Sequence, residues 1–159
     1  MTRVIAFTHL PFAGFFFAAA TARAVLLSIL PLKALSLLGS AQHVSVLFFV
    51  VSVCGIGASL GIYSILRHIS LRTGFLISSL AMVFSIALLW TQDLWTFSLG
   101  MMFHVFGITS MEVILSLHVM QKIPRSQLSE FEPLRMVSTV MALSIGPWLG
   151  VYLQSRHAD

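Results

Sequence analysis

The sequence predicts an all-α membrane protein, a polytopic bundle of about five transmembrane helices. Hydrophobic residues make up 58% of the 159 positions, and only 9% are Asp, Glu, Lys or Arg, against roughly 25% in an average soluble protein. Nine basic and five acidic side chains are too few to coat a soluble domain of this size. The apolar runs are continuous rather than alternating, and backbone groups find no partners in lipid, so the runs favour helices over strands.

The first apolar run covers residues 10–32 and has Arg23 as its only charged residue. It is long enough to span, because about 20 residues cross the hydrocarbon core. Arg3 followed by apolar residues is also typical of a signal peptide, and residues 18–22 include alanines suited to a cleavage site. The run continues past them to Leu32, longer than a typical signal h-region. We therefore expect an uncleaved first helix.

Four further runs complete one transmembrane domain over residues 1–159. Their approximate spans are 44–66, 73–90, 94–120 and 136–153. The turn at residues 91–93 is so short that the third and fourth helices should be antiparallel neighbours. Residues 122–135 contain two prolines and several charges, which favours an exposed loop with room for a short amphipathic helix.

Lysine and arginine counts predict the orientation. A cytoplasmic N-terminus places six basic residues on the cytoplasmic side and two, Lys33 and Arg156, on the other, which fits the positive-inside rule. The six are Arg3, Arg67, Arg72, Lys122, Arg125 and Arg135. We expect an integral protein of a bacterial-type inner (cytoplasmic) membrane, with its N-terminus in the cytoplasm.

The chemistry-bearing residues form no enzyme signature. The net charge of +4 suggests nucleic acid in a soluble protein, but here the basic residues flank apolar runs, so we expect no nucleic-acid partner. The chain has no phosphate-binding glycine loop, nucleophile elbow or zinc motif, and its six histidines are scattered. We expect no catalytic residue, no metal site and no cofactor. The single cysteine, Cys54, lies in an apolar run and is typical of a packing residue.

Three ionisable residues within the spans are candidates for a substrate or ion pathway. Arg23 and Glu112 would each cost at least about 2.5 kcal/mol at the centre of a bilayer, so they should face protein or a water-filled cavity. Their estimated depths differ by roughly 6 Å, which an arginine side chain can bridge as a charge pair. The alternative is that Arg23 makes a polar contact between helices and Glu112 reaches the headgroups. His104 can relay protons or bind an anionic group, and the alternative is that it makes a single interhelical hydrogen bond.

Small residues predict close contacts between helices. Gly57 and Gly61 form a GxxxG pattern in the second span, a spacing that lets helix backbones approach each other. In the fifth span, Gly146 and Gly150 flank Pro147, which removes one helical hydrogen bond. Packing explains both patterns, and a hinge at Pro147 is a further hypothesis.

Two of these motifs resemble the amino-terminal half of a major facilitator superfamily (MFS) transporter. Residues 61–72, GIYSILRHISLR, are similar to the basic loop that follows the second helix of that family. Gly61, Arg67 and Arg72 match its glycine and basic positions, whereas Leu66 stands where the family has an aspartate. Residues 146–150, GPWLG, are similar to the glycine–proline signature of the fifth helix. The resemblance extends over nearly the whole chain, in matching helix order.

The resemblance implies secondary transport of a small solute by alternating access, with the first and fourth helices lining the cavity. These are the helices that carry Arg23, His104 and Glu112. Family members normally place the site between two halves, so the chain is expected to be a truncated remnant, a half, or a protein that needs a second membrane chain or a second copy of itself. The alternative is a non-transporting accessory or assembly protein that packs against another membrane protein. A membrane enzyme ranks third.

Overall fold

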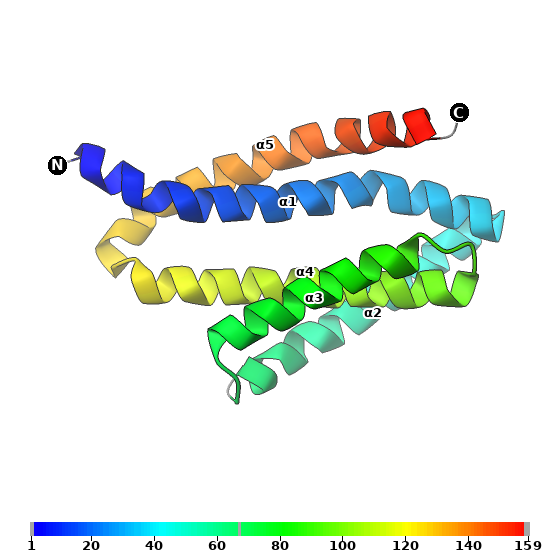
Figure 1. Ribbon diagram of the computed structural model, residues 1–159, viewed down its shortest axis with the longest axis horizontal. Coiled ribbons are helices and arrows are strands. Elements are labelled where there is room, and N and C mark those ends of the chain that lie inside the picture. Colours follow the sequence, from blue (N-terminus) through cyan, green and yellow to red (C-terminus); the bar gives the residue numbers. More distant parts are fainter. Residues whose placement is uncertain (1, 67, 158–159) are drawn as a thin grey trace. The chain divides into compact units, whose positions relative to one another are not determined.

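The computed structural model describes residues 2–66 and 68–157, and these residues form helices and no strand. The five helices are α1 (Thr2–Leu38), α2 (Ala41–Leu66), α3 (Leu71–Leu89), α4 (Leu94–Lys122) and α5 (Arg125–His157) (Figure 1). The predicted all-α class is confirmed. Within the described residues only short connections separate one helix from the next.

All five helices are long and apolar enough to cross a membrane. The candidate spans are Phe12–Leu38, Ala41–Ile62, Leu71–Leu89, Leu94–Lys122 and Ser126–Tyr152. Large apolar side chains cover their outer surfaces: Leu60 is 75% exposed, Phe49 70% and Leu80 67%. Soluble monomers rarely expose apolar patches of more than a few hundred Å². This surface fits an integral membrane protein whose solvent is the bilayer.

Capping interactions define the C-terminus of α1 and the N-terminus of α3. Gly39 has a φ of 64°, a left-handed conformation that favours glycine, and its N–H donates to Leu35 O at 2.8 Å. This contact closes the last turn of α1 in the way typical of a glycine after a helix C-terminus. Ser70 precedes α3 and accepts a hydrogen bond from Thr73 N at 3.2 Å, a serine N-cap.

The predicted exposed loop over residues 122–135 is wrong for most of its length. Only Ile123 and Pro124 separate α4 from α5, because α5 already begins at Arg125 and contains Pro133 in its interior. Leu128 and Phe131 recur at helical spacing and line a cavity, described below, together with residues near the end of α4. That apolar stripe supports a helix, although Pro133 cannot donate a backbone hydrogen bond. Likewise α1 extends at both ends beyond the predicted span 10–32.

The chain divides into two compact units, which are described separately. The first contains residues 1–31 and 115–159, and the second contains residues 32–114. The second unit therefore holds the end of α1, all of α2 and α3, and most of α4. The first holds the rest of α1, the end of α4 and all of α5.

Close backbone approaches hold α3 and α4 together in the second unit. A Cβ added at Gly100 would lie 2.9 Å from Leu88 Cβ, and one at Gly107 would lie 3.2 Å from Ser78 O. Gly107 follows Gly100 on α4, whereas its neighbour Ser78 precedes Leu88 on α3. The two helices are antiparallel neighbours, as the short turn between them predicts.

In the first unit, α5 packs along α1 in the same direction. Phe16 of α1 contacts Phe131 near the start of α5, with ring centroids 6.3 Å apart. Further along, Ala24 of α1 meets Gly146 of α5. The later residue of α1 contacts the later residue of α5, so the two helices are parallel.

Candidate functional site

His104 lies in the interior of the second unit, between α4 and α3. It is 5% exposed, and its Nδ1 lies 3.5 Å from Ser85 Oγ, a long hydrogen bond. The Ser85 hydroxyl also donates to Met82 O at 2.7 Å. The interhelical hydrogen bond, one of the two predicted roles, is present, and the proton relay stays a hypothesis.

Arg23 and Glu112 belong to different units. Glu112 lies on α4 in the second unit, eight residues after His104, and Arg23 lies on α1 in the first unit. Both side chains are exposed within the chain. The predicted charge pair between them therefore stays a prediction, and each residue is placed only within its own unit.

The motif loop connects α2 to α3. Arg67 falls outside the described residues. Gly61 is exposed on α2, and Arg72 is exposed in the first turn of α3. His68, between them, has its Nδ1 2.9 Å from Ser64 O. Ser70 caps the N-terminus of α3, and the Arg72 side chain next to it is exposed.

The glycine contacts of α2 differ from those expected. A Cβ added at Gly57 or Gly61 would meet nothing within 4 Å, so the predicted close approach at these two glycines is absent in the described chain. Instead Gly55 faces α4, where a Cβ would lie 2.6 Å from Val105 Cγ1. Gly55 is on another side of α2 because helix positions two residues apart diverge by about 200°.

The glycines of α5 do pack closely. Gly146 leaves no room for a Cβ against the Cβ and backbone of Ala24. A Cβ at Gly150 would lie 2.7 Å from Val25 O. Pro147 itself is exposed. Gly146 and Gly150 of the GPWLG segment thus pack against α1, and a hinge at Pro147 stays a hypothesis.

Lys33 has a role in packing that its sequence position did not indicate. Its Nζ donates to Leu89 O at 2.6 Å and lies 6.0 Å from the centroid of the Phe97 ring. Leu89 is the last residue of α3, where a carbonyl has no partner within its own helix. A cation at a helix C-terminus is also favoured by the helix dipole. Lys33, counted above only for orientation, joins α1 to the α3–α4 turn within the second unit.

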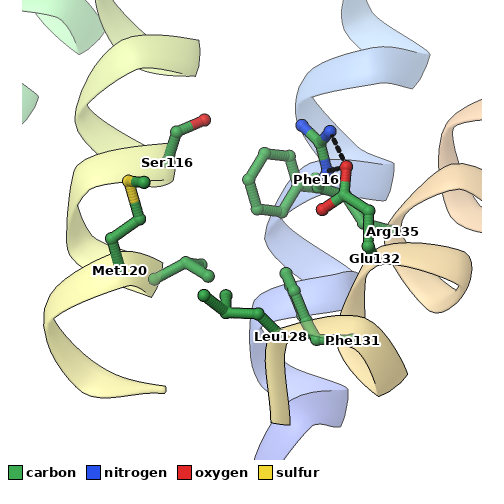
Figure 2. A pocket seen from close by; sticks show the side chains of 8 residues that line it. Phe16, Ser116, Met120, Leu128, Phe131, Glu132 and Arg135 are labelled. Carbon is green, nitrogen blue, oxygen red and sulfur yellow. Dashed lines mark hydrogen bonds and ion pairs between the residues drawn. The ribbon is translucent and has the colours of Figure 1, made fainter. Parts of the chain in front are cut away.

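A cavity of about 330 Å³ lies in the first unit, between α1, the end of α4 and the start of α5. Figure 2 shows Phe16 between Ser116 and Met120 on one side and Glu132 and Arg135 on the other. The cavity is largely apolar and partly open. Its lining residues are Phe16, Ser116, Val119, Met120, Leu128, Phe131, Glu132 and Arg135.

A charged pair forms the polar side of this cavity. Arg135 Nε donates to Glu132 Oε1 at 3.1 Å, and Arg135 Nη2 also donates to Oε1. The Arg135 guanidinium carbon lies 5.4 Å from the centroid of the Phe16 ring, within the range of a cation–π contact. Both Oε2 of Glu132 and Nη1 of Arg135 are left outside the pair. The sequence did not indicate this site, because its prolines and charges favoured a loop at both residues, although opposite charges three residues apart are typical of one helix face.

The described residues contain no group of three or more His, Cys, Asp or Glu side chains that could hold a metal ion. No protein-family model matches the chain, and no curated protein or solved structure is significantly similar to it.

Proposed function

We propose that the chain is a helix bundle of the major facilitator type, which moves a small solute across the membrane by alternating access together with a second bundle. The main support is the polar content of α4. His104 is buried at the α3 contact, and Glu112, the only acidic residue of α4, follows two turns later. Such groups are costly in lipid and typically mark a solute or ion path.

Two further features support the proposal. The GPWLG segment of α5 packs against α1 through Gly146 and Gly150, which accounts for small residues at both positions. The basic loop between α2 and α3 suits a cytoplasmic location under the positive-inside rule. On this basis we propose a cytoplasmic N-terminus and an inner-membrane location. Arg23 on α1 would be a third polar group on the path.

Alternating access is testable without knowing the solute. Ile108 lies midway between His104 and Glu112 on α4. A cysteine at Ile108, in a Cys54→Ala background, should react with an impermeant maleimide from both faces of the membrane. The measurement uses right-side-out and inside-out vesicles from expressing cells. A cysteine at Leu80, which is 67% exposed on the outer surface of α3, is the control and should stay unlabelled because lipid disfavours the reactive thiolate.

Labelling of the Ile108 cysteine from one face only would contradict alternating access. It would favour the second candidate, an accessory protein that packs against another membrane protein. One observation supports that alternative: Gly57 and Gly61 leave an open small-residue strip on α2, where a partner helix can approach closely. Replacing both glycines with isoleucine should then abolish co-purification with the partner and leave the chain folded.

A further inference from the structure

The cavity between α1, α4 and α5 has two chemically different sides. Phe16, Met120 and Phe131 provide apolar surface, and the Glu132–Arg135 pair provides both charges. Both residues are partly exposed, with 35% of the Arg135 side chain and 48% of the Glu132 side chain accessible. Exposed ion pairs contribute little to stability. A ligand that supplies an opposite charge to each residue can therefore separate the pair at a small cost in free energy.

The position of the pair along α5 suits a lipid headgroup. The candidate span Ser126–Tyr152 has 27 residues, or roughly 40 Å of helix, which matches the hydrocarbon core plus both headgroup regions. Glu132 lies six residues into this span, roughly 9 Å from its start. The pair therefore lies near the boundary between headgroups and acyl chains. The apolar part of the cavity extends from it along α4.

Charge balance selects among headgroups. A purely anionic headgroup would pair with Arg135 but lie beside the Glu132 carboxylate. A quaternary amine has no N–H to donate. A headgroup with a phosphate and a primary ammonium satisfies both residues, because the phosphate accepts from Arg135 and the ammonium donates to Glu132 Oε2. Arginine suits phosphate well, since its fork of donors matches the phosphate oxygens.

We propose that this cavity binds one membrane phospholipid with a zwitterionic, primary-amine headgroup, of which phosphatidylethanolamine is the type. The phosphate lies against Arg135, the ammonium lies against Glu132, and an acyl chain covers Phe16, Phe131 and Met120. None of the lining residues is one of the proposed solute-path residues Arg23, His104 and Glu112, so the proposal does not depend on transport. Phe16 holds the guanidinium in place from α1.

Lipid retention by the full-length chain tests this proposal. The protein is placed in nanodiscs with equal amounts of phosphatidylcholine, phosphatidylethanolamine and phosphatidylglycerol. Lipids that remain bound after transfer to the gas phase are counted by native mass spectrometry. The wild type should retain phosphatidylethanolamine over phosphatidylglycerol by about tenfold, the scale of one charge-assisted hydrogen bond.

Two substitutions should change this preference in different ways. Glu132→Gln removes the negative charge that pairs with the ammonium and with Arg135, so the preference should shift by about tenfold toward phosphatidylglycerol. Arg135→Gln should lower retention of both lipids to the phosphatidylcholine level. Glu130→Gln is the matched control, because Glu130 is exposed on the same helix and does not line the cavity. If Arg135→Gln fails to fold, the shift in Glu132→Gln alone decides the test.

Three outcomes would overturn the proposal. The first is equal retention of all three lipids by the wild type. The second is an effect of Glu130→Gln as large as that of Glu132→Gln. The third is displacement of the bound lipid by glycerophosphoethanolamine, its headgroup without acyl chains, at equal concentration. That result would assign the site to a free water-soluble zwitterion instead.

Discussion

At the turn between α3 and α4, the Asp93 carboxylate accepts hydrogen bonds from the backbone N–H of Thr96 at 2.8 Å and from its hydroxyl at 2.7 Å. Asp93 immediately precedes α4 and is its N-cap. Because both bonds favour the charged carboxylate, they lower the pKa of Asp93 below its ordinary value of 3.8. The stability of the N-terminal end of α4 therefore depends on the protonation of Asp93.

We expect the Asp93→Asn variant to keep the helix cap and to lose the pH dependence that the Asp93 carboxyl gives to stability. Asparagine is a comparable N-cap but carries no proton that titrates. The extra stability from a lowered pKa is present above the unfolded-state pKa and is lost as the pH falls through the folded-state pKa. The melting temperature of the wild type should therefore fall relative to that of the asparagine variant below about pH 3.8, measured by circular dichroism in detergent. Parallel pH curves for the two proteins would contradict this. Asp93→Ala, which lacks the acceptor, should melt lower than both at neutral pH.

Asp93 and Lys33 differ in how far their roles can be predicted. Asp93 lies three residues before Thr96 at the start of an apolar run, a local pattern that indicates a cap. The acceptor of Lys33 is Leu89 O, 56 residues away in the sequence. No local pattern indicates such a contact, because it requires the end of α1 to lie beside the end of α3.

At the scale of the helices, apolar runs predicted the number and order of elements well. They could not show which side of a helix faces a neighbour, because spans in lipid are apolar on all sides and hydrophobic periodicity is weak. Gly57 and Gly61 have the favoured GxxxG spacing but face open space, whereas Gly55 and Gly146 meet neighbouring helices. Glycine spacing therefore identifies candidates, and the rotation of each helix selects among them.

This difference yields a matched pair of substitutions. Gly146→Ala should lower the free energy of unfolding by about 1–3 kcal/mol, because its Cβ would overlap Ala24. Gly57→Ala has open space and should raise that free energy by about 0.5–1 kcal/mol, since alanine is the better helix former. Unfolding of both variants in SDS titrations, followed by circular dichroism, gives the comparison. Equal effects of the two changes would show that the α1–α5 contact is absent.

At the scale of the whole molecule, the chain is an integral membrane protein with two compact units, each built from parts of several helices. The unit boundaries fall within α1 and within α4 rather than in loops. Each unit therefore brings together segments distant in sequence, as when Phe16 meets Phe131.

The proposed orientation in the membrane can be tested by cysteine labelling. In a Cys54→Ala background, single cysteines at Ser70 and Ser126 should be labelled by impermeant reagents only from the cytoplasmic side, and one at Gln92 only from outside. All three positions are exposed at helix ends, so each thiol is accessible wherever water reaches it. Labelling is measured on intact cells and on inverted vesicles. Reaction of the Ser70 cysteine from outside would reverse the orientation and remove the topological support for the MFS resemblance.

The sequence by itself determined the all-α membrane class, the order of the five helices and the antiparallel turn between α3 and α4. These features follow from composition and from runs of residues, which are local properties. Tertiary structure decided which glycines make contacts, where Lys33 donates its hydrogen bond, and that Glu132 and Arg135 meet Phe16 at a cavity. Such features depend on the rotation of each helix about its axis. In a bilayer, packing between specific partner helices sets that rotation. Contact with lipid is equally favourable for every apolar face, so it does not select one.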